Sequence, residues 1–157
     1  MHPDHFRADI VRPTLTYLGM WSDAAENLIV GTALAESNLS FLHQFNDGPA
    51  LGVMQIEPAT HDDVWNNFLA FRPPLSGKMN RLLAAEPERR RQLQTNLAYA
   101  VAMARLVYYR HPDPLPEAHD LQGLALTWKT VYNTPLGAGR PEEFIRRYEA
   151  AHPLNGL

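Results

Sequence analysis

The sequence predicts an all-α protein, and two observations support this prediction. Apolar residues recur at helical spacing in one segment after another, and the breaks between the segments are short and rich in proline and glycine. Alternation of apolar and polar residues is weak throughout, although a short hairpin near residues 48–56 fits the pattern. The chain has 157 residues, 45% of them apolar, so we expect residues 1–157 to form one domain with a hydrophobic core.

Caps and breaks define the expected elements. Ser22 is a good N-cap, because its hydroxyl can accept from a free N–H of the first helical turn. Proline stops a helix or occupies its first turn, and paired glycines favour a turn. In chain order we expect a helix over 3–18, a helix from Ser22 to Glu36 or Ser37, an irregular stretch over 38–58, a helix from Thr60 to about Phe71, a break at 72–74, a short helix opened by Ser76, a long helix from Pro87 to about Tyr109, a helix that Asp120 caps and that reaches Val131, a turn at 137–139, and a last helix from Pro141.

Composition excludes several classes of partner. The net charge is −3 and the pI is about 6.1, which disfavours nucleic acid as a partner. The one basic run, residues 89–91, is interpreted as a solvated helix face. Cysteine is absent, so disulfides and thiolate chemistry are excluded. Apolar runs are too short for a membrane span, and the first residues do not resemble a signal peptide.

Glu36 is the residue that most clearly predicts chemistry. It shares the apolar face of its helix with Ile29 and Ala33, and it lies at the C-terminal end, where the helix dipole is negative. Both effects disfavour a carboxylate, so we expect a raised pKa, as general acid catalysis near neutral pH requires. The alternative is a structural core glutamate that is satisfied by a backbone or tyrosine hydrogen bond.

The residues around Glu36 carry a family resemblance. Ala35-Glu36-Ser37-Asn38-Leu39 is followed by Gly48-Pro49-Ala50-Leu51-Gly52-Val53-Met54-Gln55 and then by Pro58-Ala59-Thr60. Further along lie Asn96-Leu97-Ala98 and Val131-Tyr132-Asn133. In content and order these segments resemble the lytic transglycosylase family, whose soluble members share a lysozyme-like domain that cuts peptidoglycan. The resemblance implies a helical, lysozyme-like fold with a substrate cleft beside Glu36.

The resemblance also implies roles for individual residues. Glu36 is the implied catalytic acid and base, and the implied substrate-binding residues are Ser37, Gly52, Met54, Gln55, Tyr132 and Asn133. Glycines 48 and 52 allow a tight turn close to a sugar, Gln55 offers an amide to an N-acetyl or hydroxyl group, and Met54 offers an apolar surface. Core packing is the alternative for Met54. Two features depart from the commoner pattern: Pro49, which makes the loop stiffer, and the continuation 134–139 after Tyr132-Asn133. The segments 134–139 and 57–63 look more like phage-encoded relatives.

The expected reaction needs one carboxyl group. In the family, the acid protonates the glycosidic oxygen, the N-acetyl group assists, and the same residue then takes the C6 hydroxyl proton as a 1,6-anhydro ring closes. A hydrolase would need a second carboxylate, for which Asp47 and Glu57 are candidates, although a turn and a helix start also explain them. Residues 61–63, His-Asp-Asp, are better explained as charges in a helical first turn than as metal ligands.

Taken together, the sequence predicts a monomeric enzyme that cuts the MurNAc–GlcNAc β-1,4 bond of peptidoglycan without a metal or cofactor. The phage-like segments favour a protein made in the host cytoplasm that acts on the periplasmic wall, as an endolysin or a virion-associated enzyme, and the alternative is a secreted bacterial effector. Two alternatives are a hydrolytic muramidase of the same fold and a phage structural protein that binds glycan without cutting it.

Overall fold

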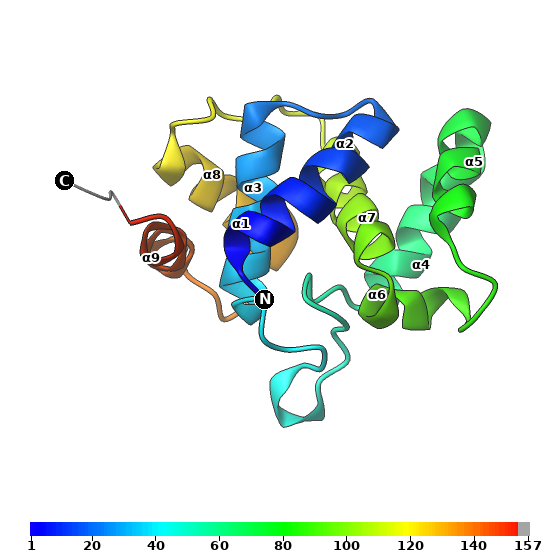
Figure 1. The fold of residues 1–157 in the computed structure, drawn as a ribbon, viewed down its shortest axis with the longest axis horizontal. Coiled ribbons are helices and arrows are strands. Elements are labelled where there is room, and N and C mark those ends of the chain that lie inside the picture. The colour runs from blue at the N-terminus through cyan, green and yellow to red at the C-terminus, as the bar shows by residue number, and fades with distance from the viewer. Residues whose placement is uncertain (154–157) are drawn as a thin grey trace.

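The computed structural model describes residues 1–153, and every regular element within that range is helical (Figure 1). The prediction of an all-α protein is therefore confirmed. The hairpin expected over 48–56 does not form as a pair of strands. Leu51 instead makes isolated bridges to His43 and to Ile56, within a loop that links two helices.

The first two expected helices are present at the expected places. Residues 3–18 form a continuous helical rod made of α1 (Pro3–His5), the π-helical segment η1 (Phe6–Val11) and α2 (Arg12–Leu18). Helix α3 (Asp23–Ser37) begins after Ser22, whose Oγ accepts from the Ala25 N–H at 3.0 Å. It ends at Asn38, which is left-handed with φ 49°.

The next two helices each begin at a proline. Helix α4 (Pro58–Asn67) begins at Pro58, two residues before the predicted cap Thr60, and the turn η3 (Leu69–Phe71) follows it. Helix α5 (Pro73–Leu82) begins at Pro73, where the sequence predicts only a break. In both cases the fixed φ of proline suits the first helical turn, where no N–H is needed.

The prediction of one long helix from Pro87 is wrong for its N-terminal half. Residues 89–95 form a short turn and a one-turn helix, η4 (Arg89–Arg91) and α6 (Gln92–Thr95), and α7 runs over Leu97–Tyr109. Asn96 separates α6 from α7, because its side chain accepts from the Tyr99 N–H at 3.1 Å and caps α7. The basic run 89–91 is exposed, but it lies in this turn and not on a helix face.

The last part of the chain follows the prediction. Asp120 caps α8 (Leu121–Thr127) through the Gly123 N–H, the π-helical segment η5 (Trp128–Asn133) continues it, and α9 is Pro141–Ala151. Helix α9 packs against α3 and α8.

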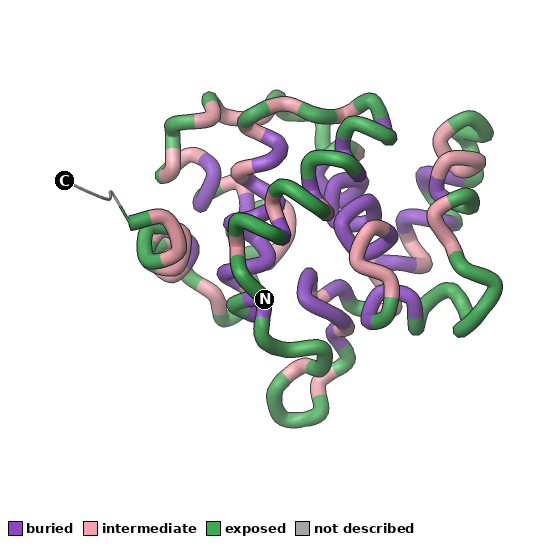
Figure 2. Tube along the Cα trace, in the orientation of Figure 1, coloured by how far each residue is buried: buried purple, intermediate pink, exposed green. Residues whose placement is uncertain are grey.

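Helices α3 and α7 form the centre of the molecule. Both are buried over most of their length (Figure 2). Helix α3 contacts α2, α7, α8 and α9, and α7 contacts α2, α4, α5 and η5. No helix in the described range is long and apolar enough to cross a membrane. The C-terminal end of the central helix α3 emerges beside the loop over 38–57, which brings Glu36 to the edge of the core.

Candidate active site

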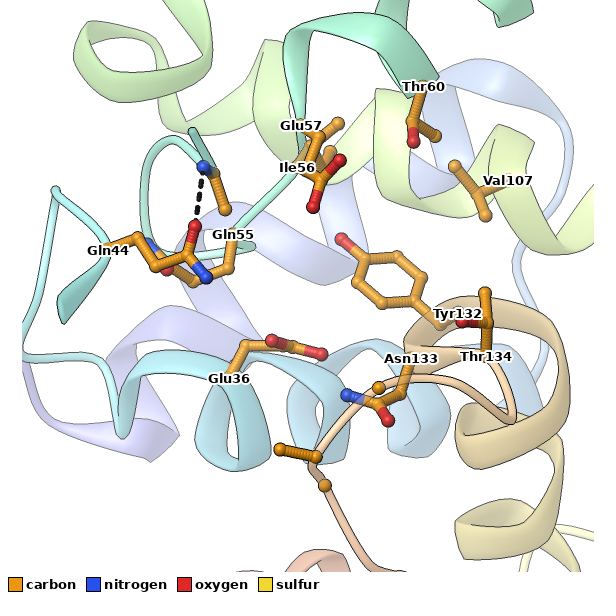
Figure 3. Close-up of a pocket in the computed structure, with 14 residues that line it drawn as sticks. Glu36, Gln44, Gln55, Ile56, Glu57, Thr60, Val107, Tyr132, Asn133 and Thr134 are labelled. Carbon is orange, nitrogen blue, oxygen red and sulfur yellow. Dashed lines mark hydrogen bonds between the residues drawn. The ribbon is translucent and has the colours of Figure 1, made fainter. Parts of the chain in front are cut away.

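A pocket of about 370 Å³ lies at the C-terminal end of α3 (Figure 3). Its walls come from α3, the 44–60 segment, α7, η5 and the turn after η5. Most lining side chains carry a carboxyl, amide or hydroxyl group: Glu36, Glu57, Gln44, Gln55, Asn133, Thr60, Tyr132 and Thr134. Such a lining suits a ligand rich in hydroxyl and amide groups.

Glu36 lines this pocket from the penultimate position of α3 and is only partly exposed. Burial raises its pKa to about 7, against an ordinary value of 4.5. A hydrogen bond from Trp128 and the charge of Arg147 act in the opposite direction and limit this rise. The predicted rise of the Glu36 pKa is therefore confirmed, and burial is its main cause.

The sequence does not predict two of the groups that act on Glu36. The Trp128 Nε1–H donates to Glu36 Oε1 at 3.0 Å, across 92 positions of the chain. The Arg147 guanidinium donates to the carbonyls of Leu34 and Ala35, at 3.0 and 2.7 Å. Arg147 therefore satisfies free carbonyls at the negative end of α3, next to the acid. The sequence pattern marks Trp128 only as a core residue, because nothing local connects it to Glu36.

Tyr132 reaches the pocket but does not bond to Glu36. Its hydroxyl donates to the Met54 carbonyl at 2.6 Å, and its ring stacks on Tyr108 with centroids 5.3 Å apart. Burial, together with the nearby Glu36 charge, raises the Tyr132 pKa well above its ordinary value, so the hydroxyl stays a donor. Tyr132 therefore fastens η5 to the 48–56 loop.

Three of the predicted binding residues do not line the pocket. Met54 is fully buried in the core, so its side chain offers no surface to a sugar, and only its carbonyl has a role, as acceptor for Tyr132. Ser37 is also fully buried, and its Oγ donates to the Val53 carbonyl at 2.7 Å. Ser37 therefore holds the loop against α3, and the Met54 carbonyl holds it against η5.

Gly52 is needed for a close approach to backbone, not to a sugar. Its φ is +75°, and a Cβ at this position would lie 1.9 Å from the Leu93 carbonyl oxygen. Gln55, which does line the pocket, is left-handed with φ 48°, and its Nε2 donates to the Gly52 carbonyl at 2.9 Å. The glycine and the glutamine thus form one tight turn that presents Gln55 to the pocket.

The turn after η5 forms another part of the pocket wall. Asn133 and residues 137–139 line the pocket, and Lys129 Nζ bonds both Asn133 Oδ1 and the Gly137 carbonyl at 2.8 Å. Thr134, which also lines it, is a β-branched residue at φ 71°. A residue of this type rarely adopts that conformation, so the turn holds backbone strain at the pocket.

The structure separates the two candidate second carboxylates. Glu57 is exposed at the N-cap of α4 and lines the pocket across from Glu36 (Figure 3). Asp47 lies in the exposed turn η2 (Phe45–Asp47) and is not among the lining residues. The local explanation of Glu57 as a helix-start residue holds, but the fold also places it in the pocket.

The side chains of residues 61–63 all pair with other groups of the protein. His61 is fully buried, and its ring nitrogens pair with Asp62 at 3.0 Å and with the Tyr99 hydroxyl at 2.7 Å. Asp62 also pairs with Arg90, and Asp63 pairs with Arg110 at 2.6 Å. Residues 1–153 contain no group of three or more histidines and carboxylates placed to hold a metal ion.

Comparison with known proteins adds no identification. No protein-family model, curated protein or solved structure matches the chain. The pocket and its residues are therefore the basis for inferring the function.

Proposed function

We propose that the protein is a lysozyme-like enzyme that cleaves the β-1,4 bond between MurNAc and GlcNAc in peptidoglycan, with Glu36 as the acid and base. The observation that carries the proposal is a carboxyl group with a pKa of about 7 that lines a polar pocket. At neutral pH such a group is about half protonated, so it can give a proton and later accept one. The order of motifs around Glu36, Gln55 and Tyr132 adds support.

In the proposed reaction, Glu36 transfers its proton to the O4 of the leaving GlcNAc as the bond from that oxygen to MurNAc C1 breaks. The N-acetyl oxygen of MurNAc bonds to C1 and holds the positive charge that develops there. The Glu36 carboxylate then removes the C6 hydroxyl proton, O6 bonds to C1, and the N-acetyl oxygen leaves. The C6 hydroxyl belongs to the same sugar, so little entropy is lost in bringing it to C1. The product is 1,6-anhydroMurNAc.

A hydrolytic muramidase is the second candidate, and the position of Glu57 favours it. A carboxylate across the pocket from the acid could activate a water or stabilise the charge at C1. We give preference to the single-carboxyl route because Glu57 is exposed and its pocket position does not by itself assign a base. A phage enzyme that acts on the wall from the periplasmic side is compatible with both routes.

The masses of the released fragments test the function and separate these routes. We expect digestion of purified peptidoglycan to give muropeptides that end in 1,6-anhydroMurNAc, lighter by one water than the hydrolytic product. Glu57→Gln should then retain activity, as should Asp47→Asn, a matched change outside the pocket. Reducing MurNAc ends, together with loss of activity in Glu57→Gln but not in Asp47→Asn, would establish a muramidase. Intact wall would contradict both routes and support a glycan-binding protein.

A further inference from the structure

The Trp128 indole, which donates to Glu36, is held in place by close packing on its other sides. Trp128 is 1% exposed, and its ring packs against Phe144 of α9 with centroids 5.9 Å apart. On another side lies Gly139, where a Cβ would come within 2.5 Å of the indole Cη2 atom. Because Gly139 has no side chain, the turn after η5 packs directly on the indole, which has little room to rotate.

The chemistry of the indole restricts where the Glu36 proton can lie. An indole N–H can only donate a hydrogen bond, so the oxygen that it meets must be an acceptor in both charge states of the carboxyl group. That oxygen is Glu36 Oε1, at 3.0 Å. In a protonated carboxyl group the carbonyl oxygen is the stronger acceptor, so Oε1 is the carbonyl oxygen and the proton is on Oε2.

We infer that Trp128 is the positioning residue of Glu36, and that its indole N–H holds Oε1 so that Oε2 carries the proton delivered into the pocket. The step that this proton serves rests on the proposed function. The hydrogen bond and the place of the proton rest on the geometry of Trp128 alone.

The other charged or titratable groups near Glu36 do not hydrogen-bond to it. The Arg147 guanidinium bonds the carbonyls at the end of α3 and acts on Glu36 through its charge. The Tyr132 hydroxyl bonds the Met54 carbonyl, and the Tyr108 hydroxyl pairs with Thr32 at 2.7 Å. Glu57 lies across the pocket and makes no hydrogen bond to Glu36 within the described range. Trp128 is the direct donor to the acid among residues 1–153.

The inference can be tested without any substrate. The chain has three tryptophans, so an ¹⁵N-labelled sample gives three indole N–H resonances, and the one missing from Trp128→Phe belongs to Trp128. We expect this resonance to shift with pH, with a midpoint of about 7. In Glu36→Gln the amide oxygen can still accept from the indole, so the resonance should remain but no longer shift. A Trp128 resonance that does not titrate near this pH, or that titrates equally in Glu36→Gln, would overturn the inference.

Kinetics on purified peptidoglycan distinguish positioning from simple packing. Trp128→Phe keeps a ring in the core but removes the donor that stabilises the Glu36 carboxylate. We expect kcat to fall about 10-fold with KM unchanged, and the decline of kcat at high pH to move upward by about one pH unit. A merely structural role would lower the stability without moving the pH profile, and that result would contradict the inference.

Trp21→Phe is the matched control. The Trp21 N–H also donates to a carboxylate, Glu26 Oε2 at 2.7 Å, but neither residue lines the pocket. This variant should leave the pH profile of kcat unchanged. The two proposals can fail separately. If the Trp128 resonance titrates as expected but the wild-type protein does not cut peptidoglycan, the proposed function is wrong while the pairing of Trp128 with Glu36 stands.

Discussion

A carboxyl group that gives up and then retrieves a proton near neutral pH must have similar free energies in its two charge states. At Glu36 burial disfavours the charged form, while the Trp128 N–H and the Arg147 charge favour it, and the resulting pKa is about 7. The other polar residues of the predicted motif act mainly on the loop that faces this acid. Substitutions at these residues therefore test how that loop is held.

Tyr132→Phe should affect both stability and activity. The change removes the hydroxyl that donates to the Met54 carbonyl, so the loop loses a direct tie to η5. We expect a loss of about 1–2 kcal/mol in the free energy of unfolding and about 10-fold slower wall clearance. The control is Tyr17→Phe, which removes a tyrosine bond to the Lys78 carbonyl on the exposed surface. Equal clearance by both variants would contradict a role of the Tyr132 hydroxyl in activity.

Gly52→Ala tests the turn itself. An added methyl group would meet the Leu93 carbonyl, and φ +75° is unfavourable for alanine. We expect a loss of at least about 2 kcal/mol in the free energy of unfolding, measured by chemical denaturation. Gly77→Ala in α5 is the control, because its Cβ would have room and alanine favours helices, so its stability should be equal or higher. Similar stabilities for the two variants would show that the turn tolerates a side chain.

At the scale of elements, a buried carboxylate fastens the N-terminal rod to α3. Glu26 is 2% exposed and accepts from Arg7, Arg12 and the Trp21 indole at 2.7–3.0 Å. The hydrogen bonds from these donors lower the Glu26 pKa to about 2, although its burial alone would raise it. The rod and the helix that carries Glu36 are thus held together by a charge that is present at neutral pH.

This charge predicts a specific sensitivity to acid. The folded-state pKa of Glu26 is below the ordinary 4.5. The contribution of its charge to the free energy of unfolding is therefore fully present above about pH 4.5 and is lost as the pH falls towards 2. Glu26→Gln should lower the free energy of unfolding by about 3 kcal/mol at pH 7, and by much less near pH 2. Exposed Glu149→Gln should have little effect at either pH. A Glu26→Gln deficit that does not change with pH would exclude the ionic explanation.

Elements with a local signal could be predicted from the sequence, and those defined by distant contacts could not. The Ser22 cap, the Asp120 cap and the Pro141 start are local, and the structure contains all three. The long helix from Pro87 fails because Asn96 caps a new helix in the middle of an apolar pattern that has no visible break. The π-helical segment η5 gives no separate signal either, because its apolar spacing resembles that of an ordinary helix.

The same limit applies to the site. Short motifs predict Glu36, Gln55, Tyr132 and Asn133 as site residues, and all four line one pocket. The sequence does not predict Trp128 as a partner of the acid, because this contact depends on how α8, η5 and α3 pack. Met54 belongs to the same motif as Gln55, yet its side chain points into the core.

At the scale of the whole molecule, Glu36 and the groups that favour its charged form come from one N-terminal and two C-terminal elements of the described chain. Helix α3 supplies Glu36, η5 supplies the donor to it, and α9 supplies the arginine at the end of α3. Burial of Glu36 raises its folded-state pKa from 4.5 to about 7, so the stability that its neutral form contributes is fully present below about pH 4.5 and is lost as the pH rises to about 7. The fold thus keeps an unfavourable charge at the pocket, which a function that uses this charge would explain.

The most direct test compares the wild type with Glu36→Gln on purified peptidoglycan across a range of pH. The wild type should clear the suspension, and its rate should decline as the pH rises through about 7, because the acid form is lost. Glu36→Gln should not clear it at any pH, while its thermal midpoint at or above neutral pH is equal to or higher than that of the wild type. Clearance by a folded Glu36→Gln variant at close to the wild-type rate would contradict the central claim that Glu36 is the catalytic acid.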